Sequence, residues 1–346
     1  MNSQARLVLA AAFATAVFAV ADISLAQSTQ TPADVDVSKY YVSERAYNQA
    51  ARVYGFLHGQ HLVLQTMKKQ YPAYDPELTE IEAIFDAEYG WPQPKAEAIL
   101  RAVGPEAFKK INKEYVAPVE KLAKRKFSQQ EVAAYAVEMQ DRTKGTIKLP
   151  DILQNLRWLQ YAGRPAREMN DRKVVRFSSS NHPKAAGVDL ALSAPASWLQ
   201  SEGDRPHVVQ QWLSQNGSGD MSVSLLIKAD DRLKGGLQEA DIVEMKSDDG
   251  KGFVGDNDTV LETKFVHIDG APTIRVDFVG TRDSAVGEIT SFTRSYFIIQ
   301  PGALIELACR VGRLKTQKDI SEKRFPVLQD LCEQVAITLS IANRHQ

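Results

Sequence analysis

Residues 258–280 read DTVLETKFVHIDGAPTIRVDFVG, two runs rich in β-branched and aromatic residues on either side of Asp269-Gly270. Alternation of apolar and polar residues is typical of strands that turn one face to a core. Asp-Gly between two such runs predicts a hairpin, because both residues readily adopt the positive φ angles of a two-residue turn. This stretch therefore predicts a pair of antiparallel strands.

Similar strand-like runs, rich in β-branched residues, occur through the rest of the second half of the chain. Asn216-Gly217 marks another hairpin turn, and helical patterns interrupt the strands at 237–246 and 325–341. Long consecutive strands with few crossover helices predict a mainly antiparallel sheet covered by helices. We expect strands at 187–193, 207–215, 220–228, 258–268, 272–280, 288–299 and 303–311.

The first half is helical in pattern. From Tyr40 to Tyr161, apolar residues recur at spacings of three and four, without strand-like alternation. Ser128 and Glu131 fit a capping box at the start of one helix. The clearest amphipathic stripe consists of Ala46, Ala50, Val53, Tyr54, Leu57, His61 and Leu64.

The chain opens with the pattern of a secretory signal. Arg6 precedes an apolar run at 7–21, and Ser24-Leu25-Ala26 places small residues at the −3 and −1 positions of a cleavage site. The run is shorter than the ~20 residues that span a membrane, so an uncleaved anchor is the less favoured alternative. We expect a periplasmic or secreted protein, without a transmembrane segment after cleavage near Ala26.

Composition limits the class of protein. The 346 residues are 44% hydrophobic and 25% charged, which excludes collagen-like, low-complexity and wholly disordered chains. The net charge of −1 argues against a general nucleic-acid binder, which carries a basic excess. The length favours two domains, and the predicted fold class is α+β. We expect a signal peptide at 1–26, a flexible leader at 27–38, a helical domain at 39–163, a charged linker at 164–182, and a mainly antiparallel sheet flanked by helices at 183–346.

Export would expose the two cysteines of the chain, Cys309 and Cys332, to oxidising conditions. In an oxidising compartment they can form a disulfide that closes a loop of about 23 residues. The alternative is two buried thiols that never meet. We favour the disulfide, because a final helix that folds back onto the preceding strand brings the two residues together.

The second half also resembles a known fold. Val188-Asp189-Leu190-Ala191-Leu192, followed by Ala194-Pro195-Ala196-Ser197-Trp198, is similar to the opening strand and Pro-x-x-Trp turn of the PsbP/Mog1-like fold. The closing segment from Phe325-Pro326-Val327-Leu328 agrees with the order of elements in that family. The resemblance covers about 185–346 and implies a protein that binds partners or assists assembly.

The two-part layout carries a second resemblance. The helical half, with Gly55-Phe56-Leu57 and Gly59-Gln60, and the segment Asn181-His182-Pro183-Lys184 resemble uncharacterised exported bacterial proteins. Those proteins have the same two parts. The resemblance implies no particular chemistry and no particular partner.

Motifs of catalysis are missing from the sequence. Neither Ser197 nor Ser222 lies in a Gly-x-Ser-x-Gly elbow, and no Walker loop is present. Gly217-x-Gly219 lacks the third glycine and the following helix of a dinucleotide site. We therefore predict no cofactor, and we favour a protein without enzymatic activity.

Two groups of residues have side chains of the types that serve as metal ligands. His58 and His61 lie on one face of a predicted helix, but the His-Glu-x-x-His pattern is missing, and Gly59 is better explained by close helix packing. A glycine-rich loop carries four aspartates without the order of an EF-hand, so we expect a solvated loop. We predict no metal site. The four aspartates are Asp248, Asp249, Asp256 and Asp258.

The charged linker is the candidate binding site. Guanidinium groups match phosphate and carboxylate oxygens with paired hydrogen bonds, so the linker can bind an anionic ligand such as an envelope polymer. Ion pairing between the two domains is the alternative, and it is favoured because surface charge clusters are common. The candidate binding residues are Arg157, Arg164, Arg167, Arg172, Arg176, His182 and Lys184.

These observations lead to one hypothesis of function and two alternatives. The hypothesis is an exported, non-catalytic binding or assembly factor of the bacterial cell envelope, whose partner is an envelope protein or an anionic ligand. The first alternative is an envelope hydrolase that uses His182 and the linker arginines in the cleft between the domains. The second is a small-ligand carrier, which requires a sizeable apolar cavity.

Overall fold

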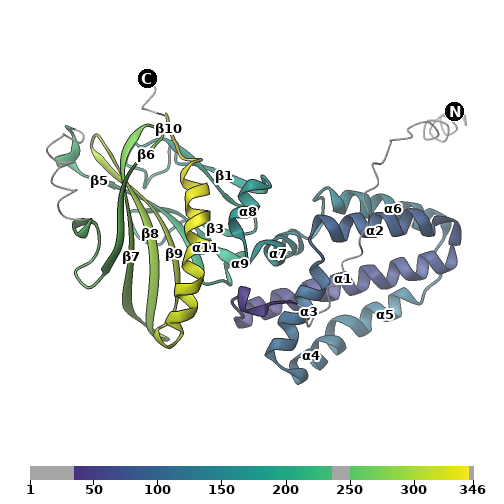
Figure 1. The fold of residues 1–346 in the computed structure, drawn as a ribbon. Coiled ribbons are helices and arrows are strands. Elements are labelled where there is room, and N and C mark those ends of the chain that lie inside the picture. The colour runs from purple at the N-terminus through teal and green to yellow at the C-terminus, as the bar shows by residue number, and fades with distance from the viewer. Residues whose placement is uncertain (1–34, 236–249, 343–346) are drawn as a thin grey trace, which may run out of the picture. The chain divides into compact units, whose positions relative to one another are not determined.

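The computed structural model describes residues 35–235 and 250–342. Within these ranges, helices are followed by antiparallel strands, so the fold class is α+β as predicted (Figure 1). The predicted signal at 1–26 and the predicted helix at 237–246 lie outside the described residues, as does most of the leader. No helix of the described residues combines the length and the apolar character needed to cross a membrane.

The helical half is organised around its longest helix, α1. A Cβ on Gly55 of α1 would lie 2.8 Å from Cβ of Tyr115, and one on Gly59 would lie 2.8 Å from a methyl group of Val119. Gly59 therefore permits close helix packing, as predicted. The elements are α1 (Glu44–Gln70), α2 (Asp75–Glu88), α3 (Pro92–Val103), α4 (Pro105–Ile111), the π-helical segment η4 (Asn112–Val116), α5 (Ala117–Ala123), α6 (Gln129–Thr143) and α7 (Pro150–Tyr161).

Two details of this half test the predicted pattern. The capping box of Ser128 and Glu131 is confirmed, because each side chain accepts a hydrogen bond from the backbone of the other residue. His61 was expected in the buried stripe, and this is wrong. Its imidazole is exposed, with Nδ1 2.9 Å from Oε1 of Glu82, because the polar ring finds a carboxylate partner at the surface.

The described strands of the second half form two antiparallel sheets. The larger has the strand order β3-β4-β5-β9-β8-β7-β6, and the smaller has the order β1-β2-β10. All the predicted strands are present, whereas the short strands β1, β3 and β10 carry too few residues to show an alternating pattern. The bounds are β1 (Val174–Ser178), β2 (Leu190–Pro195), β3 (Leu199–Ser201), β4 (Val208–Leu213), β5 (Met221–Ala229), β6 (Thr259–Ile268), β7 (Ala271–Ser284), β8 (Gly287–Gln300), β9 (Ala303–Leu314) and β10 (Ser340–Ile341).

The two predicted hairpin turns differ in form. At Asp269-Gly270 the φ angles are 48° and 72°, and Ile268 pairs with Ala271, so the two-residue turn is confirmed. At Asn216-Gly217 the strands β4 and β5 do pair, but the connection between them is longer. It contains three consecutive residues of positive φ, at 215–217.

The segment predicted as a linker and the closing helix also differ from expectation. Residues 164–182 contain α8 (Pro165–Asn170) and β1, both too short to show in the sequence pattern; the domain boundary itself stays a prediction. The closing helix α11 (Lys318–Ala336) begins seven residues earlier than predicted and includes Pro326. Phe325 and Leu328 continue its buried face across the proline, so packing outweighs the helix-breaking preference of proline.

Helix α11 lies along one face of the larger sheet, in contact with β8 and β9 (Figure 1). Cys309 of β9 and Cys332 of α11 are completely buried and form a disulfide, with their Cα atoms 5.9 Å apart. The predicted pairing is therefore confirmed. The disulfide fixes the helix to the central part of the sheet.

We expect the double variant Cys309→Ala/Cys332→Ala to lose about 3 kcal/mol of free energy of unfolding. The crosslinked residues are 23 apart, and closing a loop of this length removes about that much chain entropy from the unfolded state. Urea unfolding followed by tryptophan fluorescence measures the loss. The wild-type protein in reductant is the control and should lose a similar amount, whereas equal midpoints for variant and oxidised wild type would contradict the prediction.

Candidate functional site

The basic residues predicted as a binding site are spread over several elements. Some lie on helices at the end of the helical half, and others lie on β1 or on the segment between β1 and β2. Arg157 lies on α7, Arg164 and Arg167 lie at α8, Arg172 precedes β1, Arg176 lies on β1, and His182 and Lys184 follow it.

Several of these side chains have local partners. Nε of Arg167 lies 3.4 Å from the carboxylate of Asp171, and Nζ of Lys184 lies 2.8 Å from that of Glu202. The imidazole of His182 packs edge-on against a phenyl ring. Lys173, in the same stretch, donates to Glu88 of α2 at 2.6 Å. Of these ion pairs, the one between Lys173 and Glu88 joins the two halves, whereas the other two are local. Binding of an anionic ligand by the cluster stays a prediction.

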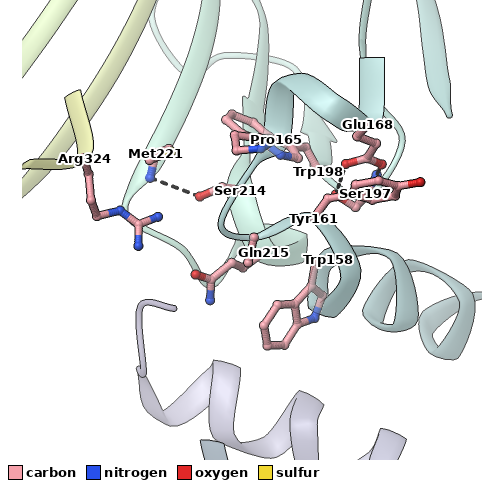
Figure 2. A pocket seen from close by; sticks show the side chains of 11 residues that line it. Trp158, Tyr161, Pro165, Glu168, Ser197, Trp198, Ser214, Gln215, Met221 and Arg324 are labelled. Atoms are coloured by element: carbon pink, nitrogen blue, oxygen red, sulfur yellow. Dashed lines mark hydrogen bonds between the residues drawn. The ribbon is translucent and has the colours of Figure 1, made fainter. Parts of the chain in front are cut away.

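A small cavity lies where α7, α8, α11 and the β4–β5 connection meet (Figure 2). Its volume is about 10 Å³, which is room for a single water. The cavity therefore leaves no space for a substrate or a carried ligand. Its walls include Trp158, Tyr161, Glu168, Ser197, Gln215 and Arg324.

Glu168 of α8 is the buried acid of this cavity, with an exposed fraction of 0%. Oε1 accepts a hydrogen bond from the Ser197 N–H at 2.7 Å, and Oε2 accepts one from the Ser197 hydroxyl at 2.6 Å (Figure 2). Burial raises the pKa of Glu168 to about 7, although these hydrogen bonds and the charge of Arg157 lower it in part. The carboxyl group thereby ties the Pro-x-x-Trp turn to α8.

The β4–β5 connection joins the sheet to the helical half through neutral polar groups. The side-chain amide of Gln215 exchanges two hydrogen bonds with the backbone of Tyr41, at 2.8 and 3.0 Å. The Asn216 amide donates to Oδ1 of Asn155 on α7 at 3.2 Å. Left-handed φ angles of 52° and 49° turn these two side chains toward the helices. We call Gln215, Asn216 and Ser218 the amide clasp.

The third member of the amide clasp completes the contact with α1. Ser218 donates to Oε1 of Gln49 at 2.9 Å, and the amide of Gln49 donates to the carbonyl of Asn216 at 3.2 Å. All these side chains are buried. Because their groups carry no charge, the contact is insensitive to pH and weakly sensitive to salt.

A charged contact lies beside the amide clasp. Asp220, whose side chain is 1% exposed, pairs with Arg313 at 2.6 Å and with Arg324 at 3.2 Å. Arg324 also donates to the carbonyl of Lys39 at 2.8 Å, and the guanidinium of Arg313 lies 4.9 Å from the ring centre of Tyr41. The two arginines therefore connect β9 and α11 to the segment that precedes α1.

The chemistry available at this junction is limited. The Ser197 hydroxyl donates to a carboxylate, with no histidine at the cavity to act as a base between them. His182, assigned to the hydrolase alternative, packs against Phe177 and does not line the cavity. The polar groups at the junction hold elements together, which is a structural role.

The two groups with metal-binding side chains have other partners. His58 stacks on Tyr54, and burial lowers its pKa. Asp258 pairs with Arg282 at 2.7 Å and accepts from the N–H of Gly255, whereas Asp248 and Asp249 lie outside the described residues. Across 35–235 and 250–342, no three His, Cys, Asp or Glu side chains are placed to hold a metal ion.

Two open hollows lie away from the junction. One, of about 430 Å³, is formed by polar residues of β7, β8 and the start of α11, including Asp283 and Lys318. The other, of about 260 Å³, lies beside α1 and α6 and has Met67 and Phe127 in its floor. Sequence reasoning missed both hollows and the junction, because each is assembled from residues far apart in the chain.

Comparisons with known proteins give weak likenesses. No family model and no curated protein matches the sequence. A crystal structure of a protein from Bacteroides thetaiotaomicron is 11% identical, with a TM-score of 0.30, and the match covers 50% of each chain. LpqN of Mycobacterium tuberculosis, described as involved in cell envelope biogenesis, is 10% identical over 51% of this chain and 95% of its own, with a TM-score of 0.31.

A third structure adds no more. A Pseudomonas aeruginosa protein of unknown function, described as a putative regulator, is 13% identical over 40% of this chain and 88% of its own, with a TM-score of 0.21. The chain spans half the length of the first of these structures. TM-scores this low carry no argument about function, and the PsbP/Mog1-like resemblance stays a prediction.

Proposed function

We propose that the chain is an exported, non-catalytic binding protein of the cell envelope, which acts by docking a protein partner. The observation that carries the proposal is the contrast between its interior and its surface. The cavity at the junction has room for one water at most, and the buried carboxyl group of Glu168 is hydrogen-bonded to Ser197, whereas a hollow of about 430 Å³ is open on the sheet half.

The compartment has separate support. The disulfide between Cys309 and Cys332 is of the kind that persists in oxidising compartments, and the sequence at 1–26 has the pattern of a secretory signal. An exported protein of this kind meets envelope proteins as its partners. The hydrolase alternative has no comparable support, because the cavity at the junction has no room for a substrate.

The open hollow is suited to a polar partner. Thr281 and Thr290 are paired across β7 and β8, with their hydroxyl oxygens 3.0 Å apart. Asp283 and Lys318 are exposed at its walls. The paired strands β7 and β8 form part of its wall, and a surface that is already ordered loses less entropy on docking.

The test is affinity capture from envelope extract with two charge-swapped variants. Asp283→Lys/Lys318→Glu exchanges the charges at the hollow, and the control Lys69→Glu/Glu77→Lys exchanges exposed charges on the helical half. Neither variant changes the net charge. We expect the wild type and the control to recover the same protein, and the hollow variant to recover at least about tenfold less, since like charges at an interface are costly. Failure of the wild type to recover any protein reproducibly, in detergent and in low salt, would overturn the proposal.

A further inference from the structure

The stretch formed by α4, η4 and α5 is strongly basic. Residues 105–126 contain six Lys and one Arg against three Glu, in a chain whose net charge is −1. The lysines are exposed throughout this stretch. We define the basic face as Lys109, Lys110, Lys113, Lys121 and Lys124.

Packing against α1 decides which side of this stretch meets solvent. Tyr115 and Val119 lie against Gly55 and Gly59, where a Cβ would come within 2.8 Å of either side chain. Phe108 packs against Tyr54 of the same helix. The aromatic and branched side chains therefore face α1, and the lysine side chains face solvent.

The π-helical segment η4 (Asn112–Val116) decides which lysine of α4 lies in line with those of α5. In a continuous α-helix, Lys121 would be rotated by about 120° from Lys109. A π turn holds about one residue more than an α turn, which rotates everything after it back by about 100°. Lys121 therefore comes to within about 20° of Lys109 around the axis. Counted in the same way, the five lysines of the basic face fall within an arc of about 140° around the axis, against about 120° in a continuous α-helix, so they share one broad outer side.

Few of these cations are neutralised within the protein. Lys109 pairs with Glu106 at 2.7 Å, on a surface where both side chains are largely exposed. Within the described residues, no ion pair is formed by the other four lysines of the basic face. Such a cluster of like charges is repulsive by itself, and an external anionic surface relieves that repulsion.

We propose that the basic face binds the surface of an anionic phospholipid bilayer through its headgroup phosphates. The proposal rests on the envelope docking role above and adds a second partner to it. Lysine ammonium groups suit a diffuse anionic plane, whereas discrete phosphate sites favour the paired donors of arginine. Single-stranded nucleic acid requires aromatic platforms, and the aromatic rings here face α1. Val103, 49% exposed at the end of α3, precedes the basic stretch and adds apolar contact area.

Co-sedimentation with lipid vesicles tests the proposal. We expect the purified protein to bind vesicles of phosphatidylcholine that contain phosphatidylglycerol, and not vesicles of phosphatidylcholine alone. Binding should disappear in about 1 M salt, where electrostatic attraction is screened beyond about 3 Å. Binding to both kinds of vesicle, or binding that survives the salt, would overturn the proposal.

Two variants of equal charge locate the surface. Each lysine near an anionic membrane contributes a factor of about five in affinity, so Lys113→Gln/Lys121→Gln should weaken binding about 25-fold. The control Lys228→Gln/Lys323→Gln removes two exposed charges elsewhere and should bind as the wild type does. Equal weakening in both variants would overturn the assignment to the basic face.

Two further measurements distinguish bilayer binding from binding of a soluble anionic polymer and from docking of the protein partner. Binding of soluble polyphosphate without binding of anionic vesicles would overturn the bilayer proposal in favour of a polymer. Capture of the protein partner depends on the hollow of the sheet half, so the Lys113→Gln/Lys121→Gln variant should still recover it. Loss of vesicle binding with intact capture would therefore show that the basic face binds the bilayer and that the partner docks elsewhere.

Discussion

Arg294→Met should lower the free energy of unfolding by about 3–5 kcal/mol, because it leaves a buried carboxylate without its cation. Arg294 on β8 donates from Nε and Nη2 to the two oxygens of Asp277 on β7, both at 2.7 Å. The side chains are 5% and 2% exposed. In the variant, the Gln329 amide, 2.8 Å from Oδ2, remains as a donor to Asp277. Urea unfolding with the disulfide intact measures the loss.

The double variant Arg294→Met/Asp277→Leu is the matched control. Replacing a buried ion pair by apolar side chains of similar volume is often neutral or stabilising, because no charge has to leave water. We therefore expect the double variant to recover most of the lost stability. If it were as unstable as the single variant, the loss would come from packing, and the explanation by an unpaired charge would be wrong.

The strands were predictable because their signal is local. In β6 and β7 the alternation of residues and the Asp269-Gly270 turn lie within one short stretch of sequence, and the turn fixes the register of the pair. The partnership of Asp277 and Arg294 depends in addition on the pairing of β7 with β8. It depends also on α11, which packs on β8 and β9 and brings Gln329 to Asp277 across 52 residues of sequence.

The junction was not predictable, and Glu168 shows why. It lies in a stretch crowded with charges, which is typical of an exposed linker. Its burial depends on Ser197, which lies 29 residues further on and supplies both hydrogen bonds to the carboxyl group. Gln215 is similar: its amide meets Tyr41 across 174 residues, through a left-handed backbone that no residue pattern required. Contacts of this kind depend on tertiary structure, which local periodicity does not encode.

Glu168→Gln should remove a pH-dependent part of the stability. The pKa of Glu168 is about 7 in the folded state, mainly because of burial, against 4.5 for the ordinary side chain. Between these two values the folded state keeps a proton that the unfolded state has released. The contribution of Glu168 is therefore present below the lower value and falls as the pH rises toward the upper one, by about 3 kcal/mol in total.

The Glu168→Gln variant carries a neutral amide of the same shape, so its stability lacks this fall with rising pH. Relative to the wild type, its free energy of unfolding should rise by about 2–3 kcal/mol between about pH 5 and about pH 8. Other groups that titrate in this range, such as Asp86 with a pKa raised by burial to about 6, are common to both proteins and cancel in the difference. A difference that stays constant over this range would show that Glu168 does not titrate there.

Ser197→Ala separates the effect of burial from that of the hydrogen bonds. The Ser197 hydroxyl donates to Oε2 at 2.6 Å, and this bond favours the charged form of Glu168. Its removal raises the pKa of Glu168 further, so the fall in stability should begin at the same pH, which the unfolded state sets, and extend to higher pH with the same slope. A fall that ended at a lower pH than in the wild type would mean that the hydroxyl favours the protonated acid. The Pro-x-x-Trp turn would then be held to α8 by a neutral carboxyl group.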